Sequence, residues 1–173
     1  TPYSYSKHGS EMEVWRASQE GVPVVIINPG IIIGNNLNNS QIQKINKNKF
    51  NFYTSGVSGF VTVEDVVKAS IGLMEANIKN ERFILVSENI SFKDFVSHIS
   101  KKNKNYSINM PKSILYLIWF VESFFSHLKL KNKFLNRALI KSLYGKSYYN
   151  GKKINNYLKN FEYSGIYSYL DKC

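Results

Sequence analysis

The 173-residue sequence has a single cysteine, Cys173, and only three arginines among its 23 basic residues. One cysteine excludes an internal disulfide framework and is typical of a reducing compartment, so we expect a cytoplasmic protein. The sequence contains no Gly-rich phosphate loop of either common spacing and no Gly-x-Ser-x-Gly nucleophile turn. No apolar run approaches the roughly 20 residues of a spanning helix, so we expect no integral membrane span.

Histidine is also scarce, because the chain has only His8, His98 and His127. Their positions do not have metal-ligand spacing to one another or to the cysteine, so we predict no metal site. Aromatic residues, in contrast, make up 14% of the chain and hydrophobic residues 43%. This composition is typical of a chain that buries a core rather than of a disordered one.

The net charge of +11 is confined to one part of the sequence. Residues 1–100 hold nine basic and nine acidic residues, whereas residues 101–173 hold fourteen basic and three acidic ones. Such an excess is consistent with a non-catalytic basic module that binds nucleic acid or an anionic membrane through residues 101–173. The 20 lysines and 20 asparagines also fit a solvated surface of biased composition. We favour that interpretation and expect no nucleic-acid partner.

Helical and strand patterns alternate along the chain, which predicts an α/β fold. Residues 4–19 have helical spacing, and residues 22–28 are apolar on both faces, as in a buried central strand of a parallel sheet. Val66, Val67, Ile71 and Met74 are predicted to form the apolar stripe of a later helix. The remaining predicted elements are strands over 50–53 and 82–86 and helices over 64–76, 91–100, 111–128, 133–143, 152–159 and 165–172.

Ile114–Val121 is the longest purely apolar run, with eight residues. Its length excludes a spanning helix. We interpret the surrounding helix, residues 111–128, as an amphipathic core or lid helix. A membrane-surface helix beside the lysine cluster is the alternative.

Tyr3 and Lys7 are spaced by four residues at the start of the first predicted helix, which places them on one helical face. A fixed ammonium group lowers the pKa of a neighbouring phenol because it favours the phenolate. A tyrosine with such a pKa is a usable general acid or base near neutral pH. The same spacing recurs at Tyr148/Lys152 and Tyr149/Lys153, but the turn at Asn150-Gly151 interrupts the helical face there.

Asn28-Pro29-Gly30 follows the apolar strand. Ligands of open α/β sheets bind beyond the carboxyl ends of the strands. Pro29 and Gly30 would let the backbone turn and approach a ligand closely, although an ordinary strand-end turn has the same composition.

Taken together, these segments resemble the carboxyl-terminal part of an extended short-chain dehydrogenase/reductase, in the NAD-dependent epimerase/dehydratase superfamily. Tyr3-x-x-Ser6-Lys7 resembles the active-site motif, and the strand through Asn28-Pro29-Gly30 to Gly34 resembles the nicotinamide-side strand and loop. Gly59–Val67 is similar to the family's FVxVxDV segment. The segments after it, in the family's order, are Arg82–Val86, Tyr149–Lys152 and Asn160–Tyr163.

The resemblance implies that Tyr3 is the catalytic acid/base and that Lys7 binds the nicotinamide ribose and activates the tyrosine. It implies NAD or NADP as the cofactor, with Tyr3, Lys7, Asn28, Pro29, Gly30 and Ile31 as cofactor-binding residues. It also implies hydride transfer at a carbinol or carbonyl carbon of a small-molecule substrate. A homodimer of the full-length protein is left open.

The resemblance also implies that the chain has two parts with different functions. Residues 1–86 would be the carboxyl-terminal part of a Rossmann-type doubly wound parallel sheet, with residues 35–59 as a substrate loop. Residues 87–173 would form a smaller, mostly helical substrate-binding region. The family's first βαβ unit, with its Gly-rich pyrophosphate loop, is missing from this sequence, so we expect the chain alone to bind NAD(P) poorly and to be inactive.

Within the superfamily, the Asn28-Pro29-Gly30 loop and the aromatic segment 114–125 are more similar to the reductase and hydroxysteroid-dehydrogenase branch. A nucleotide-sugar epimerase or dehydratase is the alternative. The scarcity of arginine weighs against it, because those enzymes commonly hold a diphosphate with basic side chains.

Overall fold

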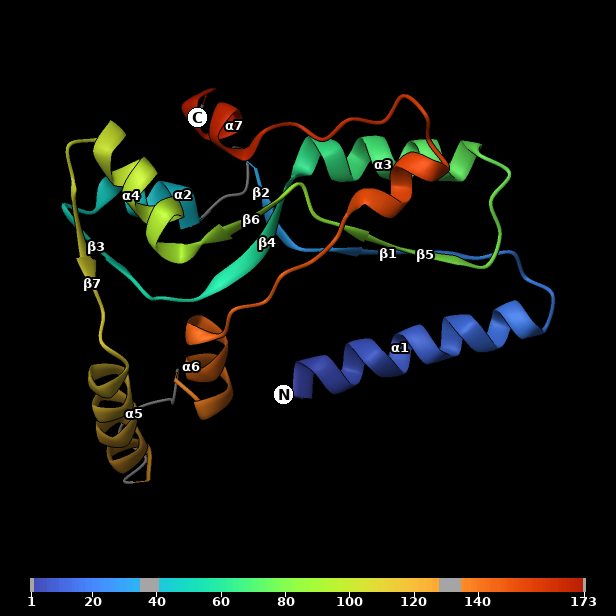
Figure 1. Cartoon of the computed structure of the whole chain (residues 1–173). Helices are drawn as coiled ribbons and strands as arrows, with labels where there is room; N and C mark the ends of the chain where they lie inside the picture. Colours follow the sequence, from blue (N-terminus) through green and yellow to red (C-terminus); the bar gives the residue numbers. More distant parts are fainter. Residues whose placement is uncertain (1, 35–40, 128–134, 173) are drawn as a thin grey trace. The chain divides into compact units, whose positions relative to one another are not determined.

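The computed structural model describes residues 2–34, 41–127 and 135–172 (Figure 1). The chain divides into two compact units. Unit 1 comprises Thr1–Gly34, Gly59–Glu88 and Tyr149–Cys173, and unit 2 comprises Asn35–Ser58 and Asn89–Tyr148. Both units are therefore assembled from separate stretches of sequence, and residues 149–173 return to unit 1. The predicted division of function at residue 86 stays a prediction.

Unit 1 holds the parallel strands of the predicted α/β fold. Its elements are α1 (Pro2–Gln19), β1 (Val25–Pro29), β2 (Ile31–Ile33), α3 (Val63–Glu75), β5 (Glu81–Leu85), the 3-10 helix η1 (Lys152–Asn156) and α7 (Ile166–Lys172). Two further strands, β4 (Val57–Thr62) and β6 (Glu88–Ser91), begin in one unit and end in the other. The elements of unit 2 are α2 (Gln41–Lys47), β3 (Phe50–Tyr53), α4 (Phe92–Lys102), β7 (Tyr106–Asn109), α5 (Lys112–His127) and α6 (Arg137–Tyr144).

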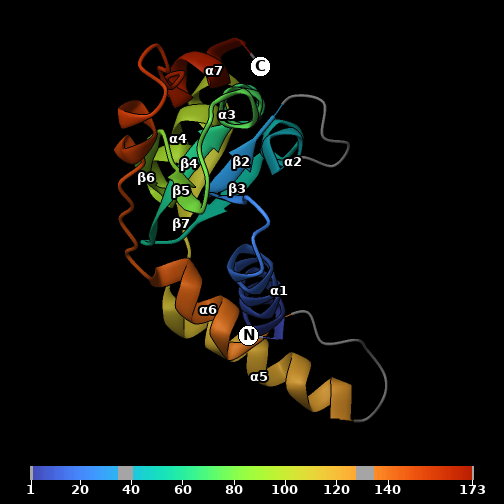
Figure 2. The same cartoon turned by 90° about the vertical axis from the view of Figure 1, so that its right-hand side faces the viewer.

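The strands of unit 1 pair in parallel, which confirms the predicted class. β1 pairs with β5 from Val25 opposite Glu81 to Pro29 opposite Leu85, and β2 pairs with β4. Parallel strands require a crossover connection, and α3 provides it between β1 and β5. Figures 1 and 2 show α3 along one side of these strands and α1 along the other.

β1 is less buried than its apolar sequence predicts. Residues 25–28 are half-buried, Pro29 is exposed, and within the described residues no strand pairs with the second edge of β1. The prediction of a strand is confirmed, whereas its burial as a central strand is not observed, because β1 has a neighbour on one edge.

The core of unit 1 lies between α3, the strands and the carboxyl-terminal segment. Its buried side chains are Val61, Ala69, Leu73, Phe83, Leu85, Ile154 and Phe161. The predicted stripe of α3 is therefore largely wrong, since Val67, Ile71 and Met74 are exposed and Val66 alone packs against the core. The buried face is the neighbouring one, which begins at the charged residue Asp65 and continues through Ala69 and Leu73.

Hydrogen bonds to the Asp65 carboxylate explain why the face of α3 that begins with this charged residue can be buried. Its carboxylate is fully buried and accepts hydrogen bonds from the Ser164 backbone N–H (3.0 Å) and the Ser164 hydroxyl (2.9 Å). Thr62 caps the same helix by accepting a hydrogen bond from the Asp65 N–H (3.1 Å). The carboxylate thus joins the first turn of α3 to the carboxyl-terminal segment.

Unit 2 is built around the parallel pair β3–β7 and helix α4. Phe50 and Tyr106 stack across the pair with ring centroids 5.5 Å apart. Ser91 caps α4, because its hydroxyl accepts a hydrogen bond from the Asp94 N–H (3.0 Å). The Asp94 carboxylate in turn accepts a hydrogen bond from the Ser91 hydroxyl (2.6 Å).

The two short helices predicted near the end of the chain differ from those observed. The first begins at Arg137 in the structure, and residues 133–134 of the prediction lie outside the described residues. The second is a 3-10 turn of five residues, Lys152–Asn156, instead of a helix over 152–159. A single 3-10 turn is enough there to bury Ile154 in the core.

Candidate functional site

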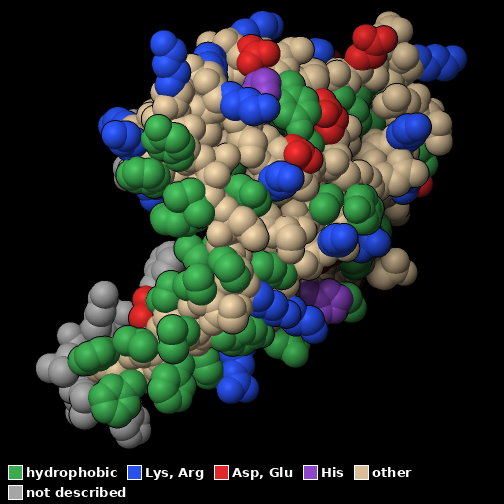
Figure 3. Space-filling view, turned by 60° about the vertical axis from the view of Figure 1, so that its left-hand side comes forward, with side chains coloured by type: hydrophobic (Ala, Val, Ile, Leu, Met, Phe, Trp, Pro, Cys, Tyr) green, Lys and Arg blue, Asp and Glu red, His purple; other side chains and the backbone are tan. Residues whose placement is uncertain are grey.

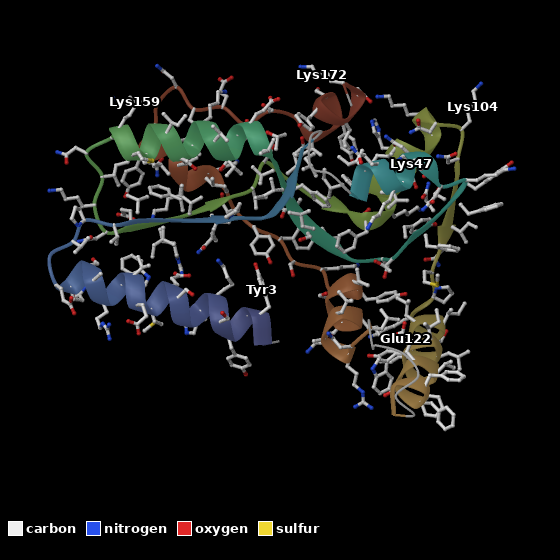
Figure 4. All side chains as sticks on the ribbon, turned by 180° about the vertical axis from the view of Figure 1, so that it is seen from behind. Tyr3, Lys47, Lys104, Glu122, Lys159 and Lys172 are labelled. Carbon is white, nitrogen blue, oxygen red and sulfur yellow. The ribbon has the colours of Figure 1, made fainter. Side chains whose placement is uncertain are left out.

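The two predicted catalytic residues lie one turn apart near the start of α1. Tyr3 is 74% exposed and Lys7 is exposed as well. Figure 4 shows the Tyr3 side chain on the side of α1 that faces the strands. The helix ends where Gly21 adopts a positive φ of 94°, a conformation that L side chains rarely take. The structure therefore brings the phenol and the ammonium group onto one accessible helical face.

Glu11 fixes the orientation of this face. It follows Tyr3 and Lys7 at the same four-residue spacing, so the three side chains form one stripe along α1. The Glu11 carboxylate accepts a hydrogen bond from the Arg82 guanidinium of β5 at 3.0 Å and from the Trp15 indole at 3.4 Å. The Arg82 hydrogen bond is the main cause of a lowered Glu11 pKa, and an Asn28 hydrogen bond contributes to it.

The contact between Glu11 and Asn28 shows where Tyr3 and Lys7 lie along the direction of β1. α1 and β1 are connected by a turn and run in opposite directions (Figure 1). Four helical residues advance about 6 Å along the axis, so Lys7 lies about 6 Å from Glu11 towards the carboxyl end of β1. Two strand residues advance about 6.6 Å, from Asn28 to Gly30. Lys7 is therefore level with the Pro29-Gly30 turn, and Tyr3 lies one helical turn beyond it.

The turn at Pro29-Gly30 is held by backbone contacts. The Gly30 N–H donates a hydrogen bond to the Leu85 carbonyl (3.0 Å). A Cβ at Gly30 would collide with the backbone carbonyl of Gly59, and a Cβ at Gly59 would collide with Val86. Gly30 and Gly59 thus allow the backbone segments around them to pass close to each other, which the sequence pattern had not revealed. Ile31 follows at the start of β2 and is 40% exposed.

A cavity of about 570 Å³ opens along β5 in unit 1. It is lined by Trp15, Asn80, Glu81, Arg82, Ile84, Asn150 and Lys153. Lys153 closes one side, because its ammonium group donates hydrogen bonds to the Glu81 carboxylate (2.6 Å) and the Arg82 carbonyl (2.9 Å). The cavity extends along β5 to Ile84, which pairs with Asn28 of β1, so it reaches the strand position that precedes the Pro29-Gly30 turn.

Sequence reasoning found Tyr3 and Lys7 but missed Glu11 and Arg82. The continued four-residue spacing from Lys7 to Glu11 could have suggested the first of them. Arg82 lies 71 positions from its partner, and no local pattern indicates such a contact.

The sequence profile of the male sterility protein family, a family of NAD-binding domains, matches residues 1–87 of this chain. Tetraketide alpha-pyrone reductase 2 from Arabidopsis thaliana is 30% identical over 111 residues, which are 60% of this chain and 35% of that enzyme. The chain thus spans about a third of the length of this relative.

Solved structures share the fold over nearly the whole chain. The structure of gox2253 superposes with a TM-score of 0.73 and 20% identity over 97% of this chain and 53% of its own. RMD from Pseudomonas aeruginosa, solved with NADPH, gives a TM-score of 0.67 and 12% identity over 98% of this chain and 54% of its own. At these identities the likeness shows the Rossmann-like fold alone. The profile, which covers half of the sequence, shows more: the chain belongs to the male sterility protein family within the extended short-chain dehydrogenase/reductase superfamily.

Proposed function

We propose that this chain is the carboxyl-terminal part of an NAD(P)-dependent reductase in which Tyr3 is the acid/base and Lys7 is the residue that positions the cofactor ribose. One observation carries the proposal. Tyr3 and Lys7 share an exposed face of α1, and the hydrogen bonds that Glu11 accepts from Arg82 and Asn28 hold that face beside the carboxyl end of β1. Ligands of open α/β sheets bind at that end.

The residues at this end of β1 suit a nicotinamide cofactor, which supplies or accepts a hydride when bound. Gly30 has no side chain, Ile31 offers an exposed apolar side chain, and the Lys7 ammonium group can donate hydrogen bonds to ribose hydroxyls. Tyr3 would give a proton to the oxygen of the substrate carbonyl, or take it from the hydroxyl in the reverse direction. Asn28, Pro29, Gly30 and Ile31 would line the nicotinamide side of the pocket.

The pyrophosphate would be held by a part of the protein that lies upstream of this chain. Two observations support this division. The chain spans about a third of the reductase that it matches, and β1 has the apolar sequence of a central strand but a partner on one edge within the described residues. We therefore propose that this chain alone binds NAD(P) weakly, and that the choice between NAD and NADP is made in the upstream part.

A reductase acting on a carbonyl group is favoured over a nucleotide-sugar epimerase. The relative with 30% identity is a reductase. The three arginines of the chain also offer few bidentate partners for a diphosphate. Unit 2, which includes residues 41–58, would contribute the substrate-binding part.

The test is the Tyr3→Phe substitution in the full-length protein, with NAD(P)H oxidation measured against a panel of ketones and aldehydes. Loss of a general acid should reduce kcat by about 10²–10⁴-fold and leave the cofactor Kd unchanged. Tyr5→Phe is the matched control, because Tyr5 is 79% exposed on the same helix but has Gly9 four residues later. Retained turnover in Tyr3→Phe, or an equal loss in the control, would contradict the assignment.

Lys7→Met should weaken cofactor binding as well as turnover, because it removes the donors for the ribose. UDP-glucose, tested in parallel, distinguishes the epimerase alternative. Epimerisation of this sugar nucleotide without reduction of any carbonyl compound would replace the reductase proposal.

A further inference from the structure

Helix α5 exposes an apolar face in unit 2. Leu117, Phe120 and Phe124 are more than 60% exposed, and four neighbours on the same side are 38–45% exposed. Helical periodicity places all seven side chains on one continuous arc, which we call the α5 face. Its residues are Ile114, Leu117, Ile118, Phe120, Val121, Phe124 and Phe125. Of the predicted core or lid helix, the core form is wrong, because this apolar surface is accessible, and the lid form stays a prediction.

The opposite side of α5 is the one that packs against the rest of unit 2. Glu122 lies on this side (Figure 4), and its carboxylate accepts a hydrogen bond from the Leu135 N–H at 3.0 Å. The Arg137 guanidinium of α6 lies over the Trp119 ring at 4.6 Å from its centroid. The side of α5 that packs within unit 2 has four half-buried residues, Leu115, Trp119, Glu122 and Ser123, while the larger apolar arc points outwards. A surface helix that covers a core turns its larger apolar face inwards instead.

The charge of the protein is concentrated in the same unit. The sequence stretches of unit 2 hold fourteen Lys and Arg against two Asp and Glu, a net charge of +12, whereas those of unit 1 have a net charge of −1. Lys112 begins α5, and Arg137 and Lys141 are exposed on α6, which packs against it. Figure 3 shows hydrophobic side chains gathered over α5 with basic side chains nearby. A large apolar face bordered by cations is complementary to an apolar surface that carries anions.

We propose that the α5 face docks on the surface of an anionic lipid bilayer, with the basic residues of unit 2 against the lipid phosphates. A helix of 16 residues is about 24 Å long, shorter than the roughly 30 Å of a hydrocarbon core. Within the described residues no helix has the length and apolarity needed to cross a membrane. The helix would therefore lie flat, with its aromatic side chains at the level of the headgroups. A nucleic acid fits this surface less well, because the α5 face itself contains no cation for the phosphates.

The test is co-sedimentation of the full-length protein with sucrose-loaded vesicles made of phosphatidylcholine and phosphatidylserine in a three-to-one ratio. The double variant Leu117→Asp/Phe120→Asp should reduce the partition coefficient at least tenfold, because it places two anions in the buried face. The matched control is Ile71→Asp/Met74→Asp on α3, where both side chains are also exposed, 52% and 84%. The control should bind within twofold of the unsubstituted protein. Far-UV circular dichroism verifies that both variants remain folded.

Vesicles of phosphatidylcholine alone test the role of the charge. Binding to them should be at least tenfold weaker, and Lys112→Gln/Lys141→Gln should weaken binding to the anionic vesicles. The proposal is overturned if the unsubstituted protein does not sediment with anionic vesicles or if the two double variants bind equally. It is also overturned if the α5 substitutions abolish self-association in sedimentation velocity or binding to a single-stranded oligonucleotide but leave vesicle binding unchanged.

Discussion

Substitution of Asp65 by alanine should be among the most destabilising single changes in unit 1. The carboxylate is fully buried at the first turn of α3 and accepts two hydrogen bonds from Ser164, at 3.0 and 2.9 Å. Its removal leaves the half-buried backbone N–H and hydroxyl of Ser164 without their acceptor. It also releases the carboxyl-terminal segment from α3.

The magnitude follows from the number and type of the lost bonds. A hydrogen bond to a charged group contributes about 1.5–3 kcal/mol, so two such bonds contribute about 3–6 kcal/mol. We expect Asp65→Ala to lower the free energy of unfolding by about 3–5 kcal/mol, a large part of the about 5–15 kcal/mol of a typical domain. Asp65→Asn should cost less, because the amide oxygen can still accept one of the two bonds.

Urea unfolding followed by far-UV circular dichroism measures this change. Glu64→Ala is the matched control, since Glu64 occupies the same helical turn but is exposed, and it should cost only the about 0.3–1 kcal/mol of its interaction with the helix dipole. A double-mutant cycle with Ser164→Ala should give a coupling energy of about 1 kcal/mol or more. Equal losses in Asp65→Ala and Glu64→Ala would refute the reasoning.

Three further predictions concern single groups of unit 1. Because the Arg82 hydrogen bond lowers the Glu11 pKa below its usual 4.5, the stabilising contribution of this pair is present above pH 4.5 and lost as the pH falls below it; Glu11→Gln should remove this part of the acid dependence of thermal unfolding. Gly30→Ala should cost about 1–3 kcal/mol in urea unfolding, because the new methyl group would collide with the Gly59 carbonyl. Burial, with a smaller contribution from a nearby carboxylate, raises the pKa of Tyr163 to about 12, so its contribution is present below pH 10 and lost between pH 10 and about 12. Tyr163→Phe should therefore make unfolding less sensitive to pH in that range, and an unchanged alkaline profile would contradict the assignment.

Local signals in the sequence predicted most helices and the paired strands β1 and β5, but not the pair β2–β4. The helix predicted over residues 91–100 corresponds to α4, and the apolar run before Asn28 corresponds to β1. The elements that the sequence did not predict depend on contacts between distant segments. The pair β3–β7 joins residues 50–53 to residues 106–109, and β7 is exposed and, with four residues, too short for its alternation to stand out.

The orientation of helices was the harder part of the prediction. In α3, two neighbouring faces both have apolar residues at helical spacing, and the buried one was concealed by Asp65. Its charge is acceptable there because Ser164, 99 positions later, donates to it. In α5, the composition suggested burial, but the side of the helix covered by α6 is fixed by Glu122 and Trp119.

The candidate site was accessible to sequence reasoning to the extent that it is local. The spacing of Tyr3 and Lys7 and the composition of the Pro29-Gly30 turn are visible in the sequence. Their common level along the sheet depends on the tertiary contacts of Glu11, which the sequence does not reveal.

The return of residues 149–173 to unit 1 has a consequence for synthesis of the protein. A ribosome releases the chain from its amino-terminal end, so α3 and β5 are available long before Ile154 and Phe161, which complete the same core. Until residues 149–173 emerge, Leu73 and Phe83 lack the apolar partners that cover them in the finished fold. A nascent chain stopped after residue 148 would therefore expose the apolar side chains of this half-formed core, the kind of surface from which folding intermediates aggregate.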